Sequence, residues 1–370
     1  MDSRERDAIL RVIDTQGGKR WTIGKESKLF EEELTAVAGV QRAVVTNSGS
    51  SALLIALLSL HLPKTNKVII PATTFPTAFN AILQAGLLPY VVDVDETLNI
   101  SYKEVEKAIK KAPDIRAVIA VGIAGNPVDL IRLREIIGKR TLIYDNCDGF
   151  GGILGEGFID SYADISCVSF HAAHIITMGE GGAVLTNNTK LADTCIKLRE
   201  WGRASGTDKP YKYHLLPKDY PSRYVYEEIG YNLKPLELQC AMGRVQLKKL
   251  EDFKIKRFFN HVKLEDAFNN TSFTIVPKDA EDSTPCWFSF AVMHKDRNRA
   301  MKIFEKNNIE TRTIFAGNIL CHPAYKNIQC IIQGALPMAN RVLREGMFVS
   351  CHPSLTEDMI AFIGKVARSI

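Results

Sequence analysis

The chain has 370 residues, of which 46% are hydrophobic and 24% are charged, and its formal net charge is +5. These values are typical of a globular protein that has two or three domains, or one large domain with an appendage, and a core deep enough to bury a cofactor. Lysine and arginine are scattered, so nothing favours nucleic-acid binding, and the longest apolar run, residues 52–58, is too short to span a membrane.

The eight cysteines lie between Cys147 and Cys351, without a C-x-x-C pair or a spacing typical of zinc or iron–sulfur sites. Scattered thiols of this kind are typical of reduced cysteines in a cytosolic protein. The first residues, Met1–Arg6, lack the apolar stretch of a secretory signal. We therefore expect a cytoplasmic protein that binds no metal.

Short strand-like runs alternate with helix patterns through the first two thirds of the chain. The pattern predicts helices that end near residue 60 and span residues 102–112 and 128–138, with strands over 43–45, 67–70, 89–94, 117–121, 141–144 and 165–169. This alternation indicates parallel strands joined by helical crossovers. In such sheets ligands gather at the carboxyl ends of the strands, so the informative residues should follow these runs.

The pattern of predicted helices and strands changes in the last third of the sequence. Residues 236–267 predict one long helix, and residues 272–276 and 287–292 predict strands, the second with the alternation of a half-exposed antiparallel sheet. We therefore predict an N-terminal arm (1–20), a large domain (21–249) and a small C-terminal domain (250–370). A Gly- and Pro-containing stretch, residues 203–222, is long enough to be a functional loop.

The segment Thr46–Leu53, with the sequence TNSGSSAL, lies between a predicted strand and a predicted helix. Backbone N–H groups at a helix start, together with hydroxyls, can hold a phosphate, which makes Gly49 and Ser50 candidate ligands. The same pattern also fits an ordinary helix N-cap.

Asp145 follows the predicted strand over 141–144, within the sequence YDNCD. A carboxylate among apolar neighbours is costly to bury without a partner. A pyridinium nitrogen would be such a partner and would turn the ring into an electron sink. An aspartate that caps a turn is the alternative.

The most specific segment is Ser169–Gly182, SFHAAHIITMGEGG, which ends a strand and turns through glycines into another. It places His171 and His174 beside the hydroxyl of Ser169. No third ligand follows at a suitable spacing, so these histidines do not predict a metal site.

In this order, the three segments resemble the sugar aminotransferase family of fold-type I PLP enzymes, and the resemblance runs from residue 21 to the C-terminus. It implies an aspartate-aminotransferase-like α/β fold, with a mostly parallel seven-stranded sheet in the large domain and a smaller C-terminal α/β domain. In that family the position of His174 is a lysine that forms a Schiff base with PLP. Here no lysine occurs between Lys139 and Lys190. Histidine cannot form that bond, but it accepts and donates protons near neutral pH.

One branch of the family, the nucleotide-sugar 3-dehydratases, carries the same replacement, and Tyr226–Lys234 and Thr311–Asn318 resemble segments of that branch. The resemblance implies removal of the C3 hydroxyl from a nucleotide-linked 4-keto-6-deoxyhexose, with L-glutamate converting PLP to PMP and ammonia released. Members that use an iron–sulfur cluster hold it with cysteines just after Trp-Gly-Arg, whereas Trp201–Arg203 is followed by no cysteine before Cys240. We therefore expect no iron–sulfur cluster, a GDP-linked 4-keto-6-deoxymannose as substrate, and a product used for a surface polysaccharide such as a lipopolysaccharide O-antigen.

The resemblance also assigns roles to single residues. His174 would be catalytic, and Asn232 would reach the phosphate in the neighbouring subunit of a homodimer with shared sites. The other cofactor-binding residues would be Gly49, Ser50 and Ser169 at the phosphate, Phe75 stacked on the ring, Asp145 at the ring nitrogen and Asp148 beside the ring hydroxyl, where the family usually has Gln or Glu. Arg203 and Arg312 would bind the diphosphate of the substrate.

Plainer interpretations exist for some of these residues: a core side chain for Phe75, and ion pairs for Arg203 and Arg312. We expect His171 to be a buried side chain rather than a partner of His174. Two other functions remain open. An aminotransferase would leave nitrogen on the sugar but would need a lysine in the site. A non-catalytic sugar-binding or regulatory homologue would have no need for the retained Asp145, Ser169 and Asn232.

Overall fold

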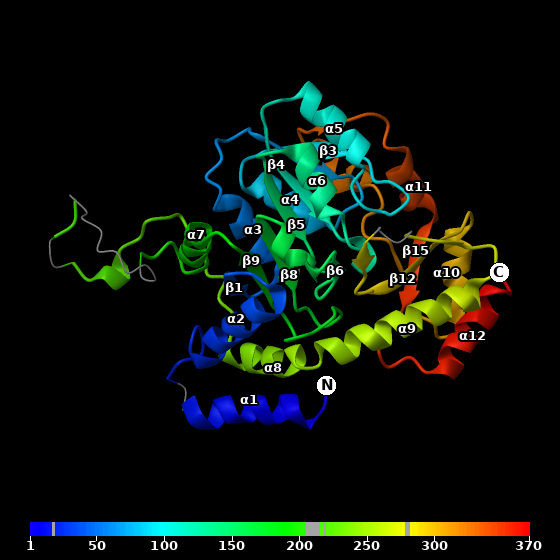
Figure 1. Cartoon of the computed structure of the whole chain (residues 1–370), viewed down its shortest axis with the longest axis horizontal. Helices are drawn as coiled ribbons and strands as arrows, with labels where there is room; N and C mark the ends of the chain where they lie inside the picture. The colour runs from blue at the N-terminus through cyan, green and yellow to red at the C-terminus, as the bar shows by residue number, and fades with distance from the viewer. Residues whose placement is uncertain (17–18, 205–214, 218–219, 278–281) are drawn as a thin grey trace.

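The computed structural model describes residues 1–16, 19–204, 215–217, 220–277 and 282–370. A large sheet lies at the centre of the molecule, with a smaller sheet beside it (Figure 1). The strand order in the large sheet is β1-β9-β8-β5-β4-β2-β3-β14. Its strands are β1 (Arg42–Thr46), β2 (Lys67–Pro71), β3 (Leu88–Val92), β4 (Ile115–Val121), β5 (Thr141–Asp145), β8 (Ile165–Ser169), β9 (Gly182–Thr186) and β14 (Ile331–Ile332).

The pairing confirms the predicted α/β class with a mostly parallel sheet. Strands β8, β5, β4, β2, β3 and β14 are parallel to one another, whereas β9 is antiparallel to both β8 and β1. The prediction of seven strands is one too few. The additional strand, β14, has only two residues and pairs with Tyr90 and Val91 of β3 at the edge of the sheet. Because it returns from the last fifth of the chain, nothing in its local sequence indicates the pairing.

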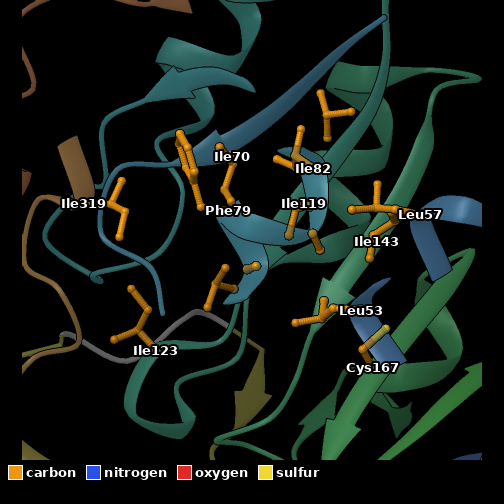
Figure 2. Close-up of a cluster of buried hydrophobic side chains, with 14 of the residues drawn as sticks. Leu53, Leu57, Ile70, Phe79, Ile82, Ile119, Ile123, Ile143, Cys167 and Ile319 are labelled. Carbon is orange, nitrogen blue, oxygen red and sulfur yellow. The ribbon is translucent and has the colours of Figure 1, made fainter. Parts of the chain in front are cut away.

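Helices cover both faces of the large sheet because successive strand residues point to opposite faces. Val68 and Ile70 of β2 pack in one cluster, and Ile69 between them packs in another. The first cluster, part of which Figure 2 shows, is covered by α3 (Gly49–Leu58), α4 (Pro76–Gln84) and α7 (Thr189–Arg199). The opposite face is covered by α5 (Tyr102–Lys111), α6 (Leu130–Ile137), α2 (Lys25–Ala38) and α8 (Glu237–Leu247).

The smaller sheet is antiparallel, with the strand order β10-β12-β15-β13. Its strands are β10 (Thr274–Ile275), β12 (Ser289–Met293), β13 (Thr311–Thr313) and β15 (Gly346–Ser350), and nearby helices are α9 (Leu250–Phe268), α10 (Arg297–Lys306), α11 (Pro337–Glu345) and α12 (Glu357–Ala367). A third, small sheet joins β6 (Ile153–Leu154), β7 (Gly157–Phe158) and β11 (Ser283–Thr284). This arrangement confirms the predicted second α/β unit, while the domain boundary at residue 250 stays a prediction.

The predicted half-exposure of residues 287–292 is wrong, since every residue of β12 is buried. Phe290 and Val292 pack against the cluster that contains α9, α10 and α12, whereas Ala291 packs in the main cluster of the large sheet. The strand is therefore covered on both faces. The predicted strand over 272–276 is also shorter, since β10 contains only Thr274 and Ile275.

The predicted long helix over 236–267 is two helices, α8 and α9, which meet at Lys248 and Lys249 (Figure 1). Neither glycine nor proline marks the break. Lys249 turns inward and forms ion pairs with Asp2, at 2.9 Å, and with Glu5. Both acids belong to the N-terminal segment, whose helix α1 (Ser3–Gln16) packs along α8. A tertiary ion pair therefore accompanies a break that local sequence does not indicate.

The loop predicted over 203–222 lies mostly outside the described residues, which within it include Arg203, Ala204 and a 3-10 helix that begins at Ser222. Across the described ranges, no helix combines the length and apolar character needed to cross a membrane.

The glycine turn before β9 is explained by close backbone contact. A Cβ at Gly182 would lie 2.5 Å from the nitrogen of Gly49 and 2.5 Å from the carbonyl carbon of Ser48. At Gly49, a Cβ would lie 2.7 Å from the Cβ of Ser169. These contacts bring together the turn after β1, the end of β8 and the start of β9.

We expect Gly182→Ala to lower the free energy of unfolding by about 2 kcal/mol, because the added methyl group collides with backbone that cannot move freely. Gly157→Ala is the matched control, since its nearest neighbour atom would lie 3.4 Å away, at ordinary contact distance. Urea denaturation of both variants measures the difference. Equal stability of the two variants would contradict this packing role.

Candidate active site

A cavity of about 860 Å³ lies where the carboxyl ends of β4, β5 and β8 face the smaller sheet. This is the place where ligands bind in open α/β sheets. Most of the predicted site residues line this cavity, namely Gly49, Ser50, Phe75, Asp145, Asp148, Ser169, His174 and Arg312. No lysine is among the described residues that line it.

His174 sits in the turn after β8, where its N–H donates to the carbonyl of His171 at 3.0 Å. Its side chain is 18% exposed, and its Nε2 lies 3.7 Å from Oδ1 of Asp148. Its Nδ1 is buried and has no hydrogen-bond partner among the described residues, while Phe288 packs edge-on against the ring, with centroids 5.5 Å apart. Burial, and then the charge of His171, lower the pKa of His174 to about 4. The ring is therefore neutral at pH 7 and can accept a proton.

The expectation that His171 is buried is wrong, because its side chain is exposed. Its Nε2 lies 3.7 Å from Oε1 of Glu180, and its ring centroid lies 5.6 Å from that of His174. The turn after β8 therefore carries one largely buried and one exposed imidazole.

Two carboxyl groups lie at the carboxyl end of β5. Asp145 is buried, and its Oδ1 accepts a hydrogen bond from the N–H of Cys147 at 3.3 Å. Oδ2 of Asp148 accepts from the N–H of Ala124 at 3.2 Å. Burial raises the pKa of Asp145, and burial together with the charge of Asp145 raises the pKa of Asp148 to about 8. Asp148 is thus protonated at neutral pH, and Asp145 lacks a cationic partner in the described part of the protein.

The segment that the sequence linked to phosphate binding forms the start of α3. Ser48 is the N-cap, and its Oγ accepts a hydrogen bond from the N–H of Ser51 at 3.1 Å. The N-cap alternative is therefore correct, and phosphate binding stays a prediction. The N-cap is compatible with anion binding, because the first N–H groups of a helix have no partner inside it and carry a partial positive charge. Gly49 and Ser50 at this helix start line the cavity.

Phe75 is not a core residue. Its side chain is 50% exposed and lines the cavity, with an edge contact to Phe315 at a centroid distance of 5.9 Å. An exposed aromatic face of this kind is suited to stacking on a planar ring.

The residues present fit PLP or PMP. The N-terminus of α3 and the hydroxyl of Ser169 suit a phosphate, Phe75 offers a face to a ring, and Asp145 is a buried carboxylate that a ring nitrogen would pair with. The buried, unpartnered Nδ1 of His174 is a further polar group that a ligand in this cavity can satisfy.

Two predicted site residues do not line the cavity of this subunit. Asn232 is exposed, and its Oδ1 accepts a hydrogen bond from Nζ of Lys234. Arg203 is half-buried, with its guanidinium 4.5 Å from the ring centroid of Trp201. Arg312 does line the cavity, and it forms an ion pair with Glu310 on the exposed surface.

Several residues that line the cavity were missed, namely Arg257, Ser289, Glu310, His322, Ser350 and His352. They lie outside the strand-end motifs of the large sheet. Of these, His322 was the most accessible to sequence reasoning, since it follows shortly after the Thr311–Asn318 segment that already supported the resemblance. Within the described ranges, no group of three or more His, Cys, Asp or Glu residues could hold a metal ion.

Comparison with known proteins is consistent with this geometry. The family model described as the DegT/DnrJ/EryC1/StrS aminotransferase family matches residues 2–367. The chain belongs to this family. Among solved structures, the GDP-4-keto-6-deoxy-D-mannose-3-dehydratase of E. coli, with bound hydrated PLP, is 26% identical and has a TM-score of 0.91, over 99% of this chain and 97% of that one. The fold is therefore the fold-type I architecture of this PLP-dependent family.

Two curated relatives are more similar in sequence. The lipopolysaccharide biosynthesis protein RfbH of Salmonella typhimurium is 34% identical, over 92% of this chain and 84% of its own. The dTDP-4-dehydro-2,6-dideoxy-D-glucose 3-dehydratase of Saccharopolyspora spinosa is also 34% identical, over 97% of this chain and 83% of its own. The family membership thus extends to proteins named for nucleotide-sugar chemistry.

The burial of His174 predicts a specific pH dependence of stability. The unfolded chain binds a proton at this residue near pH 6.5, but the folded protein does so only near pH 4, so acidification through this window favours unfolding. Relative to His174→Asn, the wild type should lose about 2 kcal/mol of unfolding free energy between pH 7.5 and pH 5. Asp148 titrates in the opposite direction but is present in both proteins.

Urea denaturation without added cofactor, at a series of pH values, measures this difference. A gap between the two proteins that does not change with pH would mean that His174 is not held neutral by burial.

Proposed function

We propose that this protein is a PLP/PMP-dependent 3-dehydratase. It removes the C3 hydroxyl of a nucleotide-linked 4-keto-6-deoxyhexose and uses L-glutamate as amino donor. The observation that carries the proposal is the buried, neutral imidazole of His174, at the position where the family has lysine, in a cavity with no lysine among its described lining residues.

The cofactor would be held without a covalent bond to the chain. The start of α3 and Ser169 would bind its phosphate, Phe75 would stack on the ring, and Asp145 would pair with the ring nitrogen. When bound, it supplies an amine that condenses with the sugar ketone and a ring that stabilises negative charge while the C3 oxygen leaves.

His174 would then act as the general acid and base. A neutral imidazole can take a proton from carbon and return it elsewhere, which a permanently charged group cannot do. Asp148, 3.7 Å from Nε2 of His174, carries a proton at neutral pH and can donate a hydrogen bond to an oxygen in the cavity. Because His174 cannot capture the cofactor as a lysine would, the amine stays free to react with the sugar.

The nucleotide is the least defined part of the substrate. We retain a GDP-linked 4-keto-6-deoxymannose as the first candidate, with a dTDP-linked 4-keto sugar as the second, since the Saccharopolyspora relative is named for a dTDP sugar. Arg312, which lines the cavity near its exposed side, is a candidate ligand for the diphosphate, and its pairing with Glu310 does not prevent this role.

A homodimer with shared sites is part of the proposal. Around Asn232 and Arg203 the described surface carries large exposed apolar side chains, including Trp201, Tyr226 and Ile229, the last of which is 94% exposed. Exposed apolar clusters of this kind mark protein–protein contacts. A second subunit that covers this surface would bring Asn232 and Arg203 toward a cavity other than their own.

The role of His174 is tested by two substitutions. We expect His174→Asn to keep the fold and bind PMP but to lower turnover by a factor on the order of 10² or more, because the general acid and base is missing. His174→Lys is the paired variant, and it should form a bond to PLP that borohydride makes permanent.

Loss of dehydration is followed by mass spectrometry of the nucleotide sugar, and the lysine bond by the mass of the reduced protein. Near-normal turnover of His174→Asn would remove this residue from the mechanism. An unmodified His174→Lys protein would mean that residue 174 does not face the cofactor.

Shared sites are tested by mixing two inactive variants. His174→Asn and Asn232→Ala, unfolded and refolded together in equal amounts, should recover about a quarter of the wild-type activity, because half of the dimers would contain one intact site. If each site were built from one subunit, every site in the mixed dimers would carry a defect. No recovery, with mixed dimers demonstrated by native mass spectrometry, would contradict shared sites.

A further inference from the structure

Arg257, on α9, is a buried cation in the wall of the cavity. Its side chain is 2% exposed, and its Nη1 donates to the carbonyls of Trp287 and Phe288 at 3.1 and 2.9 Å. Its Nε has no hydrogen-bond partner among the described residues. The charge of Arg257 lowers the pKa of Asp148, but burial and the charge of Asp145 keep that carboxyl protonated at neutral pH, so it does not neutralise the guanidinium. A buried charge without a counter-charge is costly, so this position favours an anionic ligand.

Ser289 is a second unpartnered polar group in the same wall. It is 1% exposed, and its Oγ has no hydrogen-bond partner among the described residues. Its opposite residue in the β12–β15 pairing is Ser350, so the two hydroxyls lie on one face of the sheet. Arg257, Ser289 and Ser350 all line the cavity, and the Oγ of Ser350 accepts a hydrogen bond from the N–H of His352 at 3.1 Å.

Arg257 is also close enough to His174 to influence the pKa of its imidazole. The charge of Arg257 contributes, after burial and the charge of His171, to the lowered pKa of His174, and it contributes after burial to the lowered pKa of His352. His352 is thus a neutral group beside the guanidinium and does not compensate its charge.

We propose that Arg257, Ser289 and Ser350 form a subsite for a carboxylate of the amino donor. This inference rests on the proposed function, since it assigns a substrate group to the same cavity.

A guanidinium and two hydroxyls match the oxygens of a carboxylate. The phosphate of the cofactor already has a place at the start of α3. A bulky nucleotide diphosphate is poorly suited to a guanidinium that is 2% exposed, whereas a small planar carboxylate can reach it. The diphosphate can instead be bound by Arg312, which lies at the exposed side of the cavity and pairs there with Glu310.

The subsite is tested by equilibrium binding of 2-oxoglutarate to the PLP-loaded protein. This complex has no amine to transfer and therefore cannot turn over. We expect a dissociation constant at least about tenfold higher for Arg257→Gln, and a rise of about threefold or more for Ser289→Ala, because each removes a ligand group. Lys256→Gln is the matched control, since it removes an exposed cation from the same helix, and it should bind as the wild type does.

A kinetic measurement separates ligand binding from a purely structural role. In Arg257→Lys and Ser289→Ala, KM for L-glutamate should rise by a larger factor than any change in the rate at which the PMP-loaded protein consumes the nucleotide sugar. Wild-type affinity for 2-oxoglutarate in Ser289→Ala and in either Arg257 variant would overturn the subsite. So would a defect that appears only with the nucleotide sugar.

Because Arg257 also donates to two backbone carbonyls, Arg257→Gln is first compared with the wild type by thermal unfolding. If it does not fold, Arg257→Lys and Ser289→Ala decide the question. Failure of the proposed dehydration would be recognised separately, by the product formed from the sugar, because the binding assay contains no nucleotide sugar.

Discussion

The chemistry proposed for this site depends on the burial of one imidazole ring. His174 is largely buried, lies against Phe288 and Asp148, and has no hydrogen-bond partner on Nδ1 within the described part of the chain. Burial makes the charged form of the ring costly, and so the ring stays neutral where an exposed histidine would be partly charged. Asp145 and Asp148 are buried in the same site, which raises the pKa of both carboxyl groups and keeps Asp148 protonated. Each of these groups is held in the state in which a cofactor ring and a proton transfer can use it.

The sheet makes this burial possible. Ser169, Asp145 and the start of α3 follow strands that are parallel or adjacent in the sheet, so their side chains meet at one edge although they are far apart in sequence. The glycines at 49 and 182 let the backbone segments around them approach to contact distance. The smaller sheet then closes the cavity with the face of β12 and β15 that carries Ser289 and Ser350. In the proposed function the large sheet would thus supply the cofactor ligands, and the smaller sheet and α9 add a wall that contains the cation of Arg257.

How much could be predicted from the sequence follows from how local each signal is. Gly49, Asp145, Ser169 and His174 each lie at the end of a strand-like run or in the turn after it, so their place in the cavity was foreseeable from motif and periodicity. The role expected of Asn232 depends on a second subunit and stays a prediction. Arg257 and Ser289 were missed because a residue in a long helix and a serine in a strand carry no local mark of a site. Only the β12–β15 register and the position of α9 bring them to the cavity. The eighth strand, the break at Lys248–Lys249 and the burial of both faces of β12 were missed for the same reason, because each depends on contacts between distant parts of the chain.

The central claim is that a histidine in place of lysine directs the chemistry to loss of oxygen rather than gain of nitrogen. The most direct measurement follows the nitrogen. The protein would be incubated with PLP, nitrogen-15-labelled L-glutamate and 4-keto-6-deoxyhexoses linked to GDP, dTDP or CDP, and the products analysed by mass spectrometry. The account predicts that the label is released as ammonia and that one sugar loses its C3 oxygen while it keeps a ketone. A labelled amino sugar that retains the C3 hydroxyl would contradict the account and identify the protein as an aminotransferase.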